Sequence, residues 1–199
     1  MDINFWNKRY KEAEFAYGTE PNDFLNQNAL VLKPNSKTLC LAEGEGRNAV
    51  FLASQGHDVT AIDYSEEGIK KLQQLASKDK LIIETRCIDL SNYTIEENKW
   101  DTIICIFGHF PESIRRSVFT QLYKGLKNGG VLLMEAYHKD QLNYKTGGPQ
   151  ALELLYSIED LSIDLNEFKN ITFSKVIREI KEGKYHHGES AVIQVKAIK

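Results

Sequence analysis

A regular alternation of short apolar runs and helix-like segments between residues 38 and 136 constrains the fold of this chain more than any other feature. Five apolar runs have the length of buried parallel strands, at 38–42, 58–63, 81–86, 101–107 and 131–136. Helix-like sequence lies between them, at 48–55, 66–77 and 111–127. Alternating strands and helices form right-handed crossovers, so we predict an α/β fold with a mainly parallel sheet and helices on both faces.

The two ends of the chain have a different pattern. Residues 171–180 and 190–198 read as strands that are joined by a polar segment, which predicts a C-terminal antiparallel hairpin. At the other end, Phe5, Trp6 and Tyr10 recur at helical spacing, a turn follows at 17–22, and residues 23–31 read as a second helix. We predict a single domain over residues 1–199, with an N-terminal helical cap (1–34) and a lid-like insertion (137–168).

Composition and charge narrow the class of protein. Hydrophobic residues make up 42% and charged residues 27% of the chain, as in an ordinary globular protein, and the net charge of -3 weighs against binding to nucleic acid. No apolar run approaches the roughly 18 residues of a membrane helix, and the first residues lack the apolar core of a signal peptide. Three separated cysteines form no CxxC pair, so we expect a reduced cytoplasmic protein without disulfides.

The most informative stretch is the glycine turn after the first predicted strand, which reads Ala42-Glu43-Gly44-Glu45-Gly46-Arg47-Asn48-Ala49. Because glycine has no β-carbon, such a turn allows a ligand to approach the backbone closely. In open parallel sheets, ligands bind at the carboxyl ends of the strands, where this turn is expected to lie. The same two glycines could also serve only to make a tight connection between a strand and a helix.

Three acidic residues support a ligand site at this turn. Asp63 ends the second predicted strand, where a carboxylate can accept hydrogen bonds from both ribose hydroxyls, although it could also cap the next helix. Asp89 follows the third strand and could meet the amino edge of adenine or cap a short turn. Glu43 lies at the tip of the first strand, which suits a cationic ligand.

The acidic turn distinguishes between two classes of cofactor. Dinucleotide sites use a third glycine and place phosphate oxygens on a helix N-terminus, whereas here Ala49 takes the third position and two glutamates crowd the turn. A positively charged nucleoside without phosphates fits better. S-adenosylmethionine is such a ligand, and its demethylated product is S-adenosylhomocysteine.

These residues resemble the class I S-adenosylmethionine-dependent methyltransferases, and in particular the small tellurite-resistance group with the related thiol and small-molecule methyltransferases. The resemblance rests on the segments 43–49, 63–65, 126–130, 6–10 and 17–25, together with Asp89. It implies a Rossmann-like seven-stranded sheet whose final strand is reversed. It also implies S-adenosylmethionine as cofactor and a small-molecule methyl acceptor.

The resemblance assigns roles to individual residues. Gly44 and Gly46 would contact the methionine part of the cofactor, with Glu43 near its ammonium group. Asp63 would bind the ribose, and Asp89 with Ile88 or Leu90 would frame the adenine. The other residues expected to bind the cofactor are Tyr17, Arg47, Asn48, Tyr64 and Phe107.

Two residues are candidates for a role near the transferred methyl group. His109 follows the fourth predicted strand and could orient the acceptor or take its proton, although it could instead cap the helix that begins at Pro111. Tyr10 could close over the cofactor or simply pack the first helix. We expect no metal site, because His186 and His187 lie in what reads as a solvated hairpin turn.

The predicted activity is methyl transfer to a small acceptor with a soft nucleophile, such as a thiol or an oxyanion of selenium or tellurium. The alternatives are a nucleic-acid or protein methyltransferase and a cofactor-binding module without catalysis. Amino-methylating enzymes that act on nucleic acids carry an Asn/Asp-Pro-Pro-aromatic motif after the fourth strand, where this chain reads Phe107-Gly108-His109-Phe110. A nicotinamide-dependent oxidoreductase is disfavoured by Ala49. We expect no membrane partner and a monomer or weak homodimer.

Overall fold

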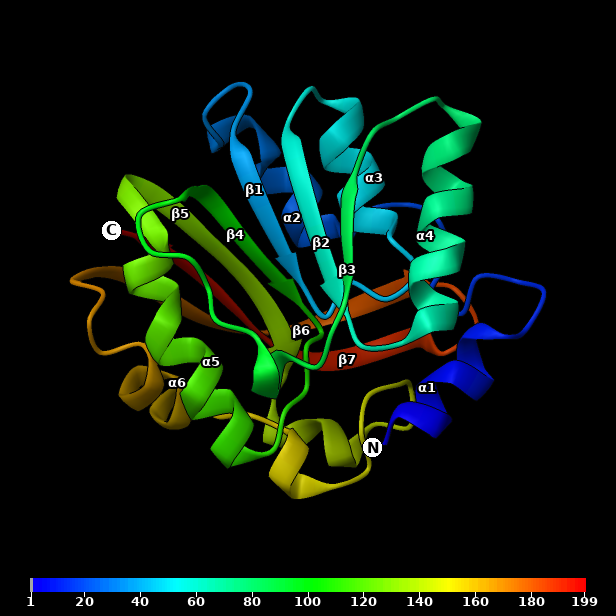
Figure 1. Ribbon diagram of the computed structural model, residues 1–199. Helices are drawn as coiled ribbons and strands as arrows, with labels where there is room; N and C mark the ends of the chain where they lie inside the picture. The colour runs from blue at the N-terminus through cyan, green and yellow to red at the C-terminus, as the bar shows by residue number, and fades with distance from the viewer. Residues whose placement is uncertain (1) are drawn as a thin grey trace.

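A single sheet organises the computed structural model, which describes residues 2–199 (Figure 1). Its seven strands follow the order β3-β2-β1-β4-β5-β7-β6. The strands are β1 (Lys37–Leu41), β2 (Asp58–Asp63), β3 (Glu84–Cys87), β4 (Trp100–Ile106), β5 (Leu126–Tyr137), β6 (Asn170–Glu182) and β7 (His186–Ile198). The pairs from β3 to β5 are parallel, and β7 pairs antiparallel with both β5 and β6. The predicted Rossmann-like sheet with a C-terminal antiparallel hairpin is confirmed.

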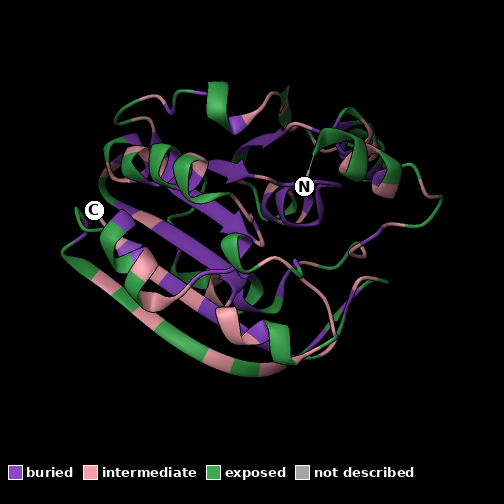
Figure 2. Cartoon of the chain, turned by 90° about the horizontal axis from the view of Figure 1, so that it is seen from below, coloured by how far each residue is buried: buried purple, intermediate pink, exposed green. Residues whose placement is uncertain are grey.

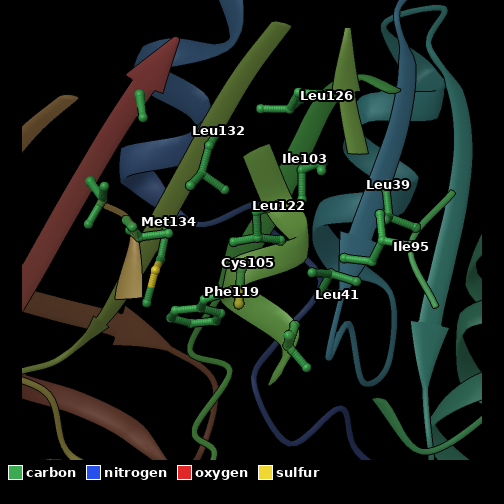
Figure 3. Close-up of a cluster of buried hydrophobic side chains, with 14 of the residues drawn as sticks. Leu39, Leu41, Ile95, Ile103, Cys105, Phe119, Leu122, Leu126, Leu132 and Met134 are labelled. Carbon is green, nitrogen blue, oxygen red and sulfur yellow. The ribbon is translucent and has the colours of Figure 1, made fainter. Parts of the chain in front are cut away.

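Helices cover both faces of the sheet because the central strands are apolar on both sides. In β1, Leu39 and Leu41 belong to one hydrophobic cluster, whereas Cys40 between them belongs to another. The first cluster contains Phe119 and Leu122 of α5 and is drawn in part in Figure 3. Figure 2 shows these central strands as buried. The helices are α1 (Ile3–Tyr10), α2 (Asp23–Asn28), α3 (Arg47–Ser54), α4 (Glu66–Lys78), α5 (Glu112–Gly125) and α6 (Ile158–Asp164).

The N-terminal segment is less helical than the sequence indicates. Helix-like sequence continues for about two dozen residues, but α1 ends at Tyr10. Beyond it, the backbone of Ala16 donates to Glu45 Oε2 (2.7 Å) and accepts from the backbone of Lys184 (3.0 Å). Tertiary hydrogen bonds to the glycine turn and to the C-terminal hairpin therefore replace helical ones in this segment. The second predicted helix divides into α2 and a short 3₁₀ turn at Ala29–Val31.

The predicted helix over 111–127 also ends early. Its last residue is Gly125, where a β-carbon would lie 2.5 Å from Cγ2 of Ile95, and the next residue already pairs with Trp100 of β4. Gly129 and Gly130 therefore lie within β5 and not at the end of the helix. Gly129, with φ of +77°, lies in a bulge that shifts the register of β5 against β4.

The C-terminal hairpin is longer and tighter than predicted. Pairing extends to Glu182 and His186, so only Gly183, Lys184 and Tyr185 form the turn, instead of the nine residues 181–189. The alternation of the strand continues through Ile180 and Glu182, both of which are buried. The tip of the hairpin therefore reaches past the sheet to the N-terminal segment.

The segment 137–168 crosses the end of the sheet at which β1, β2 and β4 terminate (Figure 1). It contains 3₁₀ turns at Lys139–Asn143 and Leu152–Leu154 before α6, and a further 3₁₀ turn, Leu90–Asn92, follows β3. Backbone hydrogen bonds join Tyr156 to both Tyr137 and Lys139, so the segment leaves the sheet and returns to it at one place. Within residues 2–199, no helix is long and apolar enough to cross a membrane.

Candidate active site

A cavity of about 1180 Å³ lies at the carboxyl ends of the parallel strands. Its walls come from α1, the glycine turn, the ends of β2, β3 and β4, residues 145–150 and the tip of the hairpin. Small-molecule sites are usually about 300–1,000 Å³. The cavity is therefore large enough for a nucleoside cofactor together with a second small molecule.

The two glycines of the turn allow helices to pack closely. Gly44 and Gly46 have φ of +62° and +91°, a conformation that favours glycine. A β-carbon at position 46 would lie 2.3 Å from Cγ of Leu72 on α4, and one at position 44 would lie 2.7 Å from Oη of Tyr10. Neither glycine lies on the wall of the cavity. Their contact with the methionine part of the cofactor stays a prediction.

The side chain of Glu43 binds the backbone of the first turn of α3 and also lies on the cavity wall. Its Oε1 accepts hydrogen bonds from the backbone of Asn48 (3.0 Å) and of Ala49 (2.8 Å). Burial raises the pKa of Glu43 to about 7, against these hydrogen bonds and the charge of Arg47, which lower it. A cationic ligand nearby would favour the ionised form, in keeping with the predicted place of the ammonium group.

The carboxylate of Asp63 is fixed by the backbone on both sides. Oδ2 accepts from the backbone of Gly44 (2.8 Å) and Oδ1 from that of Ser65 (2.8 Å). Burial raises the pKa of Asp63 to about 6, although these hydrogen bonds oppose the shift. The backbone of Tyr64 contributes a further hydrogen bond to this carboxyl, and because a carboxylate has about four lone-pair sites, Asp63 can still accept from a ligand. The orientation suits the two hydroxyls of a ribose.

The predicted adenine residues Ile88, Asp89 and Leu90 line the cavity, and so does Tyr64, which is predicted to bind the cofactor. Oδ1 of Asp89 accepts from the backbone of Ser91 (2.8 Å) and so caps the following 3₁₀ turn. Asp89 can therefore cap this turn and also meet the amino edge of adenine, because its second oxygen is not used by the cap.

His109 lines the cavity just after β4, and its ring stacks on that of Phe107. Its Nδ1 is 2.9 Å from the carbonyl oxygen of Leu154, and because a carbonyl only accepts, the proton is on Nδ1. Nε2 is buried and has no hydrogen-bond partner within residues 2–199. Burial lowers the pKa of His109 to about 3, so the ring is neutral and Nε2 can accept a hydrogen bond. It does not cap the helix that follows.

Tyr10 and Tyr17 lie in an aromatic cluster that covers the cavity from the side of α1. The ring of Tyr10 stacks on Trp6 with centroids 5.5 Å apart. The hydroxyl of Tyr17 accepts from Nη1 of Arg9 (2.7 Å). The N-terminal segment therefore supplies a wall of the cavity, and a catalytic role for Tyr10 stays a prediction.

Arg47 and Asn48 open α3 and connect the cavity to a buried polar network. Nη2 of Arg47 donates to Oε2 of Glu182 (2.7 Å), and Oδ1 of Asn48 accepts from the backbone of Asn22 (2.9 Å). Arg47 and Asn48 also line the cavity, whereas Glu182 lies behind Arg47 on the hairpin. The predicted cofactor-binding residues thus share one cavity, apart from the two glycines.

The sequence placed His186 in a solvated turn, and this interpretation is wrong. The residue is 6% exposed and lines the cavity, with ring centroids 4.3 Å from Tyr17 and 4.8 Å from Phe107. Burial lowers its pKa to about 4, although Glu182 opposes this shift. The physical reason is the length of the hairpin, which carries His186 past the edge of the sheet. The apolar alternation up to Ile180 was the signal that could have revealed it.

Comparison with known proteins finds a family that matches the central part of the chain. Residues 39–130 match the family described as "Methyltransferase domain". Over these residues the chain is similar to methyltransferase domains. The match contains the glycine turn, Asp63, Asp89 and His109, and therefore the cofactor side of the cavity.

Three relatives of this domain agree with the match. They are an "Uncharacterized methyltransferase YbaJ" of Bacillus subtilis (31% identical), a "Probable S-adenosyl-L-methionine-dependent methyltransferase TehB" of Haemophilus influenzae (37%) and a "Glycine/sarcosine N-methyltransferase" of Aphanothece halophytica (31%). The matches cover 49%, 38% and 54% of this chain, and 38%, 26% and 41% of the relatives. The chain therefore spans less than half of the length of each.

Solved structures share the fold of the methyltransferase domain and of its surroundings. TehB from Haemophilus influenzae superimposes with a TM-score of 0.74 at 21% identity, over 99% of this chain and 66% of that one. A structure described for conversion of a disulfide bond into a thioacetal group during echinomycin biosynthesis gives 0.77 at 16% identity, over 100% and 89%. The predicted resemblance to S-adenosylmethionine-dependent methyltransferases, including the tellurite-resistance group, is confirmed.

Proposed function

We propose that this protein transfers the methyl group of S-adenosylmethionine to a small acceptor with a soft nucleophile, such as a thiol or an oxyanion of selenium or tellurium. The observation that carries the proposal is the fixed carboxylate of Asp63 facing a cavity of about 1180 Å³. The carboxylate suits a ribose, and the volume leaves room for an acceptor beside the cofactor. The acceptor class rests on the resemblance to the tellurite-resistance group.

The residues present fit such a cofactor. Asp63 would accept from the ribose, Tyr64, Ile88, Asp89 and Leu90 would surround the adenine, and Glu43 would lie near the ammonium group. The sulfonium supplies an activated methyl group when bound. Methyl transfer from it is an in-line displacement, so the protein contributes mainly alignment and exclusion of water.

His109 has a limited part in this mechanism. A neutral ring with a free Nε2 can accept a hydrogen bond from the acceptor and so orient it. With a pKa of about 3, however, His109 holds a proton poorly at neutral pH. A soft nucleophile that ionises easily needs no stronger base, which is consistent with the proposed acceptors.

The proposal is tested first by thermal melting with S-adenosylhomocysteine and with NADH. A ligand at 100 times its Kd stabilises a protein by about 2.7 kcal/mol, and at this size each kcal/mol raises the Tm by roughly 2–4 °C. We expect a rise of several degrees with S-adenosylhomocysteine and none with NADH. The Asp63→Asn variant should lose most of the rise. A protein that melts unchanged with S-adenosylhomocysteine would refute the proposal.

Turnover measurements then test the acceptor. Thiols, selenite and tellurite are offered with S-adenosylmethionine, and formation of S-adenosylhomocysteine is measured. We expect turnover with at least one of these soft nucleophiles. Binding of the cofactor without turnover on any of them would favour the alternatives, which are a different acceptor class and a module without catalysis.

A further inference from the structure

The turn after β4, residues 107–111, forms part of the cavity wall without being a helix or a strand. Its first residue, Phe107, has φ of +53°, in the left-handed region that a residue with a β-carbon rarely adopts. A strained backbone of this kind persists only where the surrounding structure imposes it. The contacts that impose the shape of this turn therefore also shape the cavity.

The hydroxyl of Tyr156 binds the turn at two places. It accepts a hydrogen bond from the backbone N–H of Phe110 (2.7 Å) and donates one to the carbonyl oxygen of Gly108 (3.0 Å). Tyr156 is fully buried, and burial raises the pKa of its hydroxyl, so the proton needed for the second bond is present at neutral pH. One side chain thus satisfies the backbone on either side of His109.

His109 is held by the same segment of the chain. Its Nδ1 is 2.9 Å from the carbonyl oxygen of Leu154, two residues before Tyr156. The centre of its ring is 5.7 Å from that of Tyr156 and 5.5 Å from that of Tyr137. Residues 154–156 therefore fix both the backbone around His109 and the direction of its ring.

Tyr156 is itself anchored to rigid elements. Its backbone N–H donates to the carbonyl oxygen of Tyr137, the last residue of β5 (3.1 Å), and its own carbonyl oxygen accepts from the backbone of Lys139 (3.0 Å). The guanidinium of Arg115 on α5 lies over its ring, with the central carbon 5.1 Å from the ring centre, and this arginine is paired with Asp164 of α6. The support of the turn therefore reaches back to the sheet and to two helices.

Packing alone does not account for the hydroxyl of Tyr156. A phenylalanine would fill the same space beside Phe119, in the hydrophobic cluster to which both rings belong. Tyr156 does not line the cavity, so its hydroxyl acts on the turn and on neither the cofactor nor the acceptor. A misplacement of about 1 Å can slow a reaction by roughly 100-fold. A support of this kind therefore matters in an enzyme that works mainly by alignment.

We propose that Tyr156 is a positioning residue for methyl transfer: its hydroxyl fixes the turn after β4 and, through it, the ring of His109 that is expected to orient the acceptor. The inference rests on the proposed function and deepens it. Within the segment 137–168, residues 154–156 then form a fixed support of the site, whereas residues 145–150 supply part of its wall.

Tyr156→Phe tests the inference, because it keeps the ring and removes only the two hydrogen bonds. In steady-state kinetics with a thiol acceptor, we expect kcat to fall about tenfold. The Kd of S-adenosylhomocysteine, measured by calorimetry, should stay unchanged, since Phe107 is held separately by its bond to the carbonyl oxygen of Glu135 (2.7 Å). Tyr123→Phe, at a tyrosine of α5 outside the cavity, is the matched control and should change neither value.

The same change in the His109→Ala background separates positioning from a general structural effect. If Tyr156 acts through His109, removal of its hydroxyl should lower kcat by less than about twofold in that background, compared with about tenfold in the unaltered protein. An equal fall in the two backgrounds would mean that the hydroxyl supports the fold and not His109, and it would overturn the inference.

A second measurement does not depend on turnover. Nitrogen NMR of the imidazole rings reports which nitrogen of each histidine carries the proton, and His109→Ala identifies the signals of His109. With S-adenosylhomocysteine bound, we expect the proton on Nδ1 alone in the unaltered protein. In Tyr156→Phe we expect both tautomers, because the bond to Leu154 loses its fixed geometry. A ring that keeps one tautomer in this variant would overturn the inference.

These outcomes are distinct from a failure of the proposed function. A protein that does not bind S-adenosylhomocysteine would refute the proposed function and the inference with it. Binding of S-adenosylhomocysteine together with an unchanged kcat and an unchanged tautomer in Tyr156→Phe would refute the inference alone.

Discussion

At the scale of single residues, burial decides what the ionisable groups of the cavity can do. Desolvation disfavours the charged form, so it raises the pKa of Asp63 to about 6 and lowers that of His109 to about 3. The two shifts have opposite consequences near neutral pH. At neutral pH Asp63 is ionised, and a bound ligand can shift its pKa. His109 stays neutral between pH 6 and pH 9.

His109→Ala tests the role of this ring. Loss of one orienting hydrogen bond is worth about 1–1.5 kcal/mol, so kcat should fall roughly tenfold. Because His109 does not titrate between pH 6 and pH 9, the fall should be the same at every pH in that range. Steady-state kinetics with one thiol acceptor measure it. Unchanged turnover from pH 6 to pH 9 would show that His109 has no part in the reaction.

At the scale of elements, the glycine turn allows three helices to pack closely against one another. Gly46 is the N-cap residue of α3 and lies against Leu72 of α4, while Gly44 lies against Tyr10 of α1. The turn thus places α3 and α4 close enough to share a hydrophobic cluster that contains Leu52 and Leu72. The two glycines therefore serve the site by allowing these helices to pack closely around it.

Gly46→Ala tests this close packing. The added methyl group would collide with Leu72 in a backbone conformation, φ of +91°, that alanine adopts only under strain. Overpacking and backbone strain together predict a loss of about 2–4 kcal/mol in the free energy of unfolding, measured by urea denaturation. Gly129→Ala is the control, since its φ is +77° but nothing lies within 4 Å of the new β-carbon. Equal losses in the two variants would rule out the clash.

The sequence revealed these elements to different degrees for physical reasons. The strands and the acids at their ends depend on local alternation and on the direction of a parallel sheet, so Glu43, Asp63 and Asp89 could be placed in advance. Tyr137 could not, because its position depends on the pairing of β5 with β7, which lie far apart along the chain. His186 was misplaced because the hairpin of β6 and β7 is longer than predicted. Non-local partners also decided where the first helix ends.

At the scale of the whole molecule, a buried network of charges joins regions from the start, the middle and the end of the chain. Glu135 of β5 accepts from Nδ2 of Asn22 (2.6 Å) and from Arg178 Nη2 (2.7 Å). Glu182 connects the same Asn22 to Arg47 at the cavity. The N-terminal segment, the sheet and the hairpin are thus held together directly behind Arg47 on the cavity wall.

Arg178→Met tests the network. The change leaves Glu135, which is fully buried, and Glu182 without their shared cation, and an uncompensated buried charge typically costs about 3–5 kcal/mol. Chemical denaturation should show a loss of this size. Lys37→Met removes a surface pair with Asp58 whose side chains are 39% and 70% exposed, and it should cost less than about 1 kcal/mol. A small effect of Arg178→Met would mean that Asn22 and Gln194 satisfy Glu135 by themselves.

The position of Tyr10 affects how ligands enter and leave the cavity. Its hydroxyl rests against the α-carbon of Gly44, on the side from which a β-carbon would project. A molecule that reaches this backbone must therefore displace the tyrosine and with it the end of α1. We expect binding of such a molecule, and its release, to require movement of Tyr10 and of the end of α1.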